Sequence, residues 1–300
     1  MRLTASVLGP SGPTPAVRVR HLEAITGRSM LDYTSAIRHV MSDVVRRVGA
    51  LSVVDLDRVL VFARLGRAGA AGAYATCHSL NLPTSEPGYY FWRDRDTGRL
   101  TRRSPWFVMK TPHVVIGGTP VDYMISFALP RFCDQTLEGA RKRQHYPGYA
   151  AWVAKLDTII HELYHIDPAD AGIRRLARAD GGAHRSCHSP EFYHQVAQFV
   201  REYFASGPDP AVYDFLRHDF AELRRRHGGL VGLTFRNYPS YPQRYLEALA
   251  SQPAAAANTR LVPLEAPRQP LCYTDADLRL REFHAHGCTR VEAPARNRAA

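Results

Sequence analysis

This chain has little lysine, few cysteines and no long apolar run. The cysteines are odd in number and scattered, and none belongs to a C-x-x-C pair; they are Cys77, Cys133, Cys187, Cys272 and Cys288. Such usage argues against a disulfide framework or a cysteine-rich zinc ribbon and suits a reducing compartment. No window approaches the roughly 18 apolar residues of a membrane helix, and residues 1–20 lack the apolar core of a signal peptide. We therefore expect a cytoplasmic protein without a membrane partner.

Arginine supplies almost all of the positive charge. Only three of the 39 Lys and Arg residues are lysines, and the formal net charge is +11 at pH 7. A basic surface attracts nucleic acid and other polyanions, so DNA contact is one hypothesis. Coding bias from a GC-rich genome is the alternative, because the chain is also rich in alanine. Two short basic clusters occur, at residues 141–143 and 224–226, without a long basic tract.

The apolar patterning predicts an α+β protein. Residues 1–28, rich in proline and glycine, are interpreted as an N-terminal arm. Between residues 29 and 48, apolar residues recur at helical spacing. Strand-like runs bounded by turn signals follow, and they predict a small antiparallel-rich sheet. These runs cover residues 58–65, 73–80, 89–94, 106–110, 113–118 and 121–129.

Helical patterning dominates the second half of the chain. An apolar stripe covers residues 149–163, and another helix is expected from Ser189-Pro190, an N-cap followed by proline at the first helical position. A third helix is expected over residues 209–228, where it ends at a C-cap glycine. We predict one domain over residues 29–235 and a C-terminal extension over 236–300 that is partly linker-like.

The stretch TIIHELYHIDP, residues 158–168, carries the chemistry. Residues four apart on a helix differ by about 40° in rotation, so His161 and His165 project from one face and can bind one metal ion. Glu162 is rotated about 100° from His161 and can still reach a water molecule on that metal. The H-E-x-x-H pattern thus supplies two zinc ligands and a general base. Chance is the alternative, but these groups are costly to bury midway along an apolar helix unless something binds them.

A catalytic zinc ion takes three protein ligands and keeps one position open for water. Pro168 and Ala171 stand where the metzincin pattern needs glycine and histidine, which closes that option. His188 is the better candidate for the third ligand, because it directly precedes the Ser189 cap and its position is fixed by the start of a helix. Three other side chains are available without a specific signal: Glu191, Asp180 and His184.

HELYH, followed after 22 residues by HSPEF, resembles the SprT-like metalloproteases, a broad group whose pattern phage-type and other small bacterial metallopeptidases share. In that family a third histidine follows in an H-G-P-E-F-like segment, and a helix and a small sheet precede two active-site helices. The resemblance covers roughly residues 29–205 and implies a zincin-like core. It also implies zinc ligands His161, His165 and His188, with Glu162 as the catalytic base.

Two departures limit this resemblance. Ser189 stands where the family has glycine, which is a mild change at a helix cap. The C-terminal cysteine zinc ribbon of several SprT-like proteins is absent, because Cys272 and Cys288 have no C-x-x-C partners. DNA targeting through that module is therefore not carried over.

These observations predict a zinc-dependent metallopeptidase in which zinc and Glu162 activate a water molecule for attack on a peptide bond. The expected partner is a protein or peptide substrate, which includes proteins associated with DNA. Residues 121–129 are a candidate edge strand for pairing with an extended peptide, unless that strand is interior. The alternatives are a hydrolase of a non-peptide amide and a non-proteolytic zinc-containing interaction or DNA-associated protein on the same scaffold. The intact glutamate favours an enzyme, because a purely structural zinc site has no use for a base.

Overall fold

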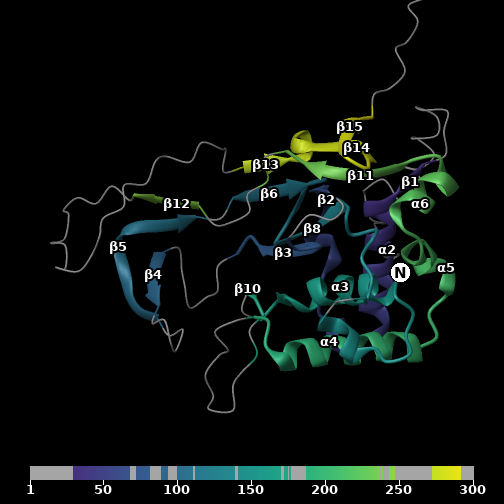
Figure 1. The fold of residues 1–300 in the computed structure, drawn as a ribbon. Helices are drawn as coiled ribbons and strands as arrows, with labels where there is room; N and C mark the ends of the chain where they lie inside the picture. Colours follow the sequence, from purple (N-terminus) through teal and green to yellow (C-terminus); the bar gives the residue numbers. More distant parts are fainter. Residues whose placement is uncertain are drawn as a thin grey trace, which may run out of the picture.

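The computed structural model describes most of the predicted domain and part of the C-terminal extension (Figure 1). The predicted arm over residues 1–28 and the linker-like stretch 251–270 lie outside the described residues. None of the helices within the described ranges combines the length and the apolar character that crossing a bilayer requires. The described ranges are 30–67, 72–81, 89–93, 100–110, 112–138, 141–169, 172–174, 176, 187–236, 238, 243–246 and 272–291.

A seven-stranded sheet in the order β15-β14-β11-β2-β8-β3, with β1 also paired to β11, forms the frame of the molecule. Its strands are β1 (Leu31–Asp32), β2 (Val59–Gly66), β3 (Ala75–Ser79), β8 (Tyr123–Pro130), β11 (Leu230–Phe235), β14 (Leu278–His284) and β15 (Gly287–Arg290). The expectation of a small antiparallel-rich sheet holds only in part, because β3, β14 and β15 pair antiparallel whereas β2 runs parallel to both β8 and β11. Alternating apolar residues identify the buried face of a strand but not its direction. Parallel neighbours also need a long connection, and the sequence does not indicate which strands such a connection joins.

Smaller sheets account for the remaining strands. One has the order β12-β5-β4, one the order β13-β6-β7, and one pairs β10 with β9. The strand-like runs predicted before residue 130 are all confirmed as strands, with shifted ends. The additional bounds are β4 (Tyr89–Arg93), β5 (Leu100–Lys110), β6 (His113–Ile116), β7 (Thr119–Pro120), β9 (Ile166–Asp167), β10 (Gly172–Ile173), β12 (Gln243–Leu246) and β13 (Cys272–Thr274).

The central strands of the main sheet are buried on both faces. Along β2, Val59, Val61 and Ala63 belong to the core beneath the helices, whereas Leu60 and Phe62 belong to a second apolar cluster on the opposite face. Side chains alternate between the two faces of a strand, so one continuous apolar run supplies both clusters. This explains why residues 59–63 are all apolar.

Three helices cover one face of the sheet, and α3 lies between the sheet and α4 (Figure 1). They are α2 (Tyr33–Arg47), α3 (Val153–Tyr164) and α4 (Pro190–Ala205). The helix predicted between residues 29 and 48 is confirmed as α2, which begins where Asp32 Oδ1 accepts the backbone N–H of Ser35 at 3.0 Å. That contact satisfies one of the unpaired donors at a helix start and sets the entry to the core.

The third predicted helix is divided into three pieces. They are α5 (Pro210–Tyr213), η4 (Asp214–Arg217) and α6 (Phe220–His227). The prediction of one continuous helix over residues 209–228 is wrong, because Asp219 is an internal N-cap whose carboxylate accepts the N–H of Glu222 at 2.8 Å. Gly228 ends α6 with a φ of 65°, as the C-cap prediction requires.

The described part of the C-terminal extension completes the main sheet. Strand β14 pairs antiparallel with β11, and β15 pairs with β14. Phe283 of β14 is fully buried in the core shared with the helices. The sequence does not predict that β14 joins the main sheet. Its alternation of leucine with arginine is brief, and its partner β11 lies more than forty residues earlier.

Asp43 joins α2 to α4. Its side chain is 3% exposed, and its carboxylate accepts hydrogen bonds from Arg47 Nε at 2.9 Å and from the Tyr203 hydroxyl at 2.8 Å. Arg46 also pairs with it. Burial opposes ionisation, but the hydrogen bonds from Arg47, Tyr203 and Arg46 outweigh it and lower the pKa of Asp43.

We expect Asp43→Asn to lower the free energy of unfolding by about 2–3 kcal/mol near pH 7, because Arg47 loses its buried charged partner. The folded pKa lies below the ordinary value of 3.8, so the contribution is present above that pH and is lost as pH falls through the folded pKa. Urea unfolding near neutral pH and at about pH 3 measures both effects. Asp57→Asn, at a side chain 78% exposed, is the control and should change stability by less than about 0.5 kcal/mol. If Asp43→Asn lowered the free energy of unfolding equally at both pH values, the ionised Asp43 carboxylate would not be the source of the stability.

Candidate metal centre

Helix α3 positions the H-E-x-x-H residues at its C-terminal end. His161 lies in the last turn and His165 is the C-cap. The prediction that these groups lie midway along the helix is wrong, because the chain leaves the helix at His165 and enters β9. His161, Glu162 and His165 are 8%, 5% and 5% exposed, so three polar side chains are buried at one point. Such burial is costly unless the groups have a partner.

The start of α4 brings His188 to the same point. Ser189 is the N-cap, and its hydroxyl accepts the N–H of Phe192 at 3.3 Å. The ring of Phe192 is fully buried, with its centroid 4.7 Å from that of His165 and 5.0 Å from that of His161. One residue thus anchors the cap and packs against both histidines of α3. His188 directly precedes this cap, as the sequence predicts.

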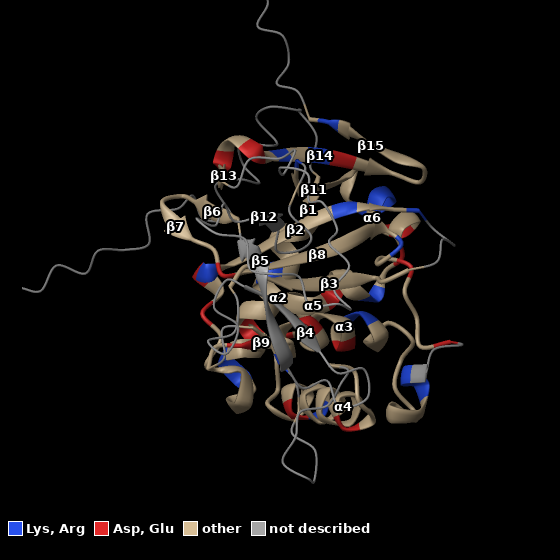
Figure 2. Cartoon of the chain, turned by 90° about the vertical axis from the view of Figure 1, so that its left-hand side faces the viewer, with Lys and Arg blue, Asp and Glu red and all other residues tan. Residues whose placement is uncertain are grey.

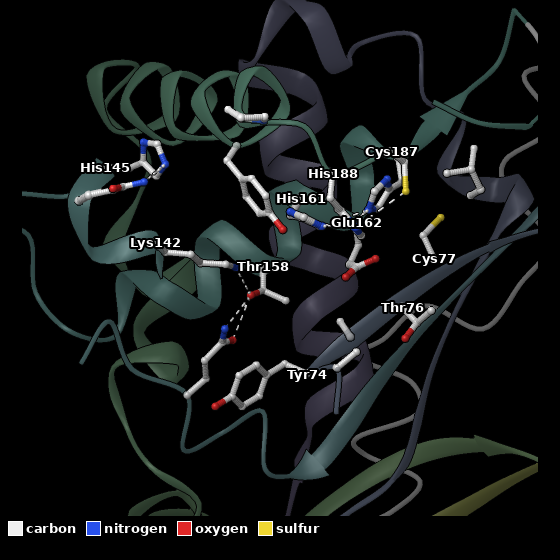
Figure 3. A pocket seen from close by; sticks show the side chains of 18 residues that line it. Tyr74, Thr76, Cys77, Lys142, His145, Thr158, His161, Glu162, Cys187 and His188 are labelled. Atoms are coloured by element: carbon white, nitrogen blue, oxygen red, sulfur yellow. Dashed lines mark hydrogen bonds between the residues drawn. The ribbon is translucent and has the colours of Figure 1, made fainter. Parts of the chain in front are cut away.

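The three Nε2 atoms form a nearly equilateral triangle. They lie 3.1 Å apart between His161 and His188, 3.0 Å between His165 and His161, and 3.0 Å between His165 and His188. Figure 3 shows His161 and His188 beside Glu162 at the wall of one cavity. Within the described part of the chain, these three histidines are the group whose ligand atoms could hold one metal ion.

Hydrogen bonds alone do not satisfy this triangle. Each ring nitrogen offers one in-plane site, either an N–H or a lone pair, so three of them cannot all pair with one another. Burial lowers the pKa of His161 well below 6.5, that of His165 to about 3, and that of His188 as well, so the rings are neutral near pH 7. Neutral imidazoles with converging lone pairs are the form that binds a metal ion.

The donor set fits zinc. Two nitrogens bound at about 2.0–2.1 Å in tetrahedral geometry are separated by roughly 3.3 Å, and the observed edges are only a few tenths of an ångström shorter. Three histidines leave a position open, which is the arrangement of catalytic rather than structural zinc. The Nδ1 atoms of His161 and His165 are buried without a hydrogen-bond partner among the described residues, so Nε2 is the side of each ring that faces other polar atoms.

Glu162 lies beside the triangle but outside it. Burial raises the pKa of Glu162 to about 8, while Lys142, the backbone N–H of Cys77 and Arg64 act in the opposite direction. The carboxylate accepts that Cys77 N–H, and Cys77 belongs to β3. Strand β3 and helix α3 therefore hold the carboxyl group between them, at the wall of the cavity that the histidines line.

A cavity of about 800 Å³ opens in front of these groups. Strand β3 forms one wall, and among the described strands it is the last one of the main sheet. The hypothesis that residues 121–129 form the edge strand is wrong, because β8 lies between β2 and β3. The all-buried pattern of β8 is that of an interior strand, so β3 takes the edge position beside the site.

Of the other candidate ligands, Glu191 is the one that the structure describes, and it is not brought to the triangle. Glu191 is exposed in the first turn of α4, and it is not part of the three-histidine group. Asp180 and His184 lie outside the described residues. Of the aromatic neighbours, Tyr193 lines the cavity, whereas Tyr164 packs against Phe192 instead.

Comparisons with protein-family models, with curated proteins and with solved structures found no match. The resemblance to the SprT-like metalloproteases therefore rests on the two sequence motifs and stays a prediction. The class of site is defined by geometry: two buried histidines and the exposed His188, all neutral, converge on one point, with a buried glutamate beside them at a cavity wall.

Proposed function

We propose that this protein is a zinc-dependent metallopeptidase. The observation that carries the proposal is the triangle of His161, His165 and His188, whose Nε2 atoms lie 3.0–3.1 Å apart. Glu162 follows His161 on α3 and lies next to this triangle. An open three-histidine zinc site with an adjacent base is the arrangement used for metal-assisted hydrolysis. The zincin-like core and the zinc ion itself are part of this proposal.

The chain's own residues have separate roles. His161, His165 and His188 would hold zinc, which when bound supplies a Lewis acid and lowers the pKa of its water. Glu162 accepts the proton of the attacking water and passes it to the leaving amine. Burial raises its pKa, which makes its carboxylate more basic. A divalent cation beside it would lower that pKa and so favour the ionised form that accepts a proton. The Cys77 N–H holds the carboxylate in place.

The edge strand supports a peptide as the substrate. Among the described strands, β3 pairs with β8 alone, and its Cys77 N–H is directed toward Glu162 rather than toward β8. An extended peptide that pairs with such an edge places its carbonyl groups next to the site. Hydrolysis of a non-peptide amide has no comparable support, because a small amide does not need an edge strand.

Contact with DNA stays a prediction. The arginines at 224–226 lie in the last turn of α6, where they face the negative pole of the helix. In the view of Figure 2, basic and acidic segments lie side by side on β14. The alternative of a non-proteolytic zinc-containing or DNA-associated protein gives no role to a buried glutamate beside an open site.

Cleavage of unfolded protein tests the proposal. Zinc-loaded wild-type protein is incubated with casein, and new N-termini are counted by amine labelling. We expect one zinc ion per chain and the appearance of new N-termini. Stoichiometric zinc without any cleavage of casein or of a peptide library would favour the zinc-containing interaction protein instead.

A further inference from the structure

One end of the cavity carries a cationic group that the proposed reaction does not use. Lys142 lies in η3 (Arg141–His145), and its Nζ donates a hydrogen bond to Thr158 Oγ1 at 2.8 Å and pairs with Asp157. The Gln135 side-chain amide contacts the same hydroxyl at 2.9 and 3.0 Å. Lys142, Thr158 and Gln135 all line the cavity that contains the histidines.

The ammonium group, not its carboxylate partner, faces the cavity. The side chain of Lys142 is 18% exposed and that of Asp157 only 4%. Asp157 also accepts the hydroxyl of Tyr146 at 2.6 Å, which holds it behind the lysine. An ammonium has three donors, and the described residues engage two of them, through Thr158 and Asp157. One donor therefore remains for a molecule in the cavity.

The cation lies close to the bond that would be cleaved. Thr158 precedes His161 by three residues and Glu162 by four, which is about one turn of α3, or roughly 5 Å along the helix axis. An extended peptide advances about 3.3 Å per residue. Lys142 is therefore within reach of a side chain one or two residues from the scissile bond.

Lys142 is the one lysine or arginine side chain among the described residues that line the cavity. Among the described residues that line the cavity, Glu162 is the one acidic side chain. An acidic group of a substrate would thus meet the ammonium at the cavity wall, while its partner Asp157 does not line the cavity.

The two ends of the cavity differ. Figure 3 shows Lys142 and Thr158 on the side of Tyr74, and Cys187 on the side of Cys77, with His161 and His188 between them. Because β3 runs from Ala75 to Ser79, the lysine is at its beginning. Antiparallel pairing is slightly more stable than parallel pairing, and it places the C-terminal part of a bound peptide at the beginning of β3.

We propose that Lys142, with Gln135 and Thr158, forms a subsite that selects peptides with aspartate or glutamate directly after the cleaved bond. The proposal rests on the peptidase function proposed above. The ammonium donates a charge-assisted hydrogen bond to the substrate carboxylate, and the Gln135 amide lies next to it as a second donor. Lys142 thereby determines specificity and takes no part in the proton transfers of Glu162.

Matched peptide pairs test this subsite. The two peptides of a pair differ only by Glu or Gln directly after the cleaved bond, which is located by mass spectrometry of the fragments. We expect the wild type to favour the Glu peptide by roughly tenfold in kcat/KM, because a charged partner strengthens the hydrogen bond. In Lys142→Met the ratio should fall toward one, and in Lys142→Arg it should remain above one. Arg143→Met removes an exposed charge of the same segment and should keep the wild-type ratio.

The outcomes are separable. Zinc content and unfolding midpoints establish that each variant is folded. The ratio of kcat/KM for the Glu and Gln peptides is measured on the wild type and so does not depend on the folding of a variant. Wild-type protein that cleaves Glu and Gln peptides equally overturns the subsite and leaves the peptidase function intact. A Glu preference that survives in Lys142→Met also overturns it. Failure to cleave any peptide overturns the peptidase function itself.

Discussion

Glu162→Gln is expected to keep its zinc ion and to lose about 10²–10⁴-fold in peptidase activity, the range typical of a positioned acid or base. Glutamine has the same size and still accepts the N–H of Cys77 through its amide oxygen, so the position of the side chain changes little. An amide cannot take a proton from water near neutral pH. Because Glu162 is not one of the three converging ligands, the metal centre remains intact.

Metal content and casein cleavage, measured on the same preparation, test this prediction. Glu191→Gln is the matched control, because it changes an exposed glutamate at the start of α4 and should leave both quantities near wild type. Activity close to wild type in Glu162→Gln would rule out Glu162 as the base. Loss of zinc in that variant would instead place the carboxylate among the ligands.

His188→Ala is expected to lose most of its zinc and all activity that depends on it. The triangle then has two corners, both on α3, and the segment that leads into α4 no longer contributes a ligand. The loss of affinity should exceed about 100-fold, which is the upper range for outer-shell partners of a metal ligand. Competition with a zinc-binding dye measures the affinity directly.

His194→Ala is the control for this change. His194 is an exposed histidine on α4 whose ring contacts Gln198, so its removal should leave zinc affinity unchanged. Full zinc occupancy in His188→Ala would move the third ligand elsewhere, with Glu191, Asp180 and His184 as the next residues to test. It would also show that the Ser189 cap serves the fold rather than the metal.

The metal ligands could be predicted from the sequence because each depends on local geometry. The spacing of His161 and His165 fixes their relative direction on α3, and the Ser189 cap fixes where α4 begins. The single long-range step, the approach of α4 to α3, is achieved by Phe192, whose place in an apolar helix stripe is visible in the sequence. The metal site therefore depends on few long-range contacts that could not be predicted from the sequence.

The wall of the cavity could not be predicted in the same way. Strand β3 lies beside Glu162 only because β8 turns parallel to β2 and leaves β3 at the edge of the sheet. A pattern of alternating residues does not indicate strand direction or strand order. The prediction that residues 121–129 form the edge strand was wrong for this reason. Lys142 was one residue of a short basic cluster, and its contact with Thr158 depends on how η3 packs against α3.

Removal and return of zinc test whether the bound metal is needed for cleavage. The wild-type protein is stripped with a chelator, assayed on casein, and assayed again after one equivalent of zinc is restored. We expect activity to disappear with the metal and to return with it, while the same cycle leaves Glu162→Gln at its low residual level. Casein cleavage that continues in protein shown to be free of metal would rule out a zinc-dependent peptidase.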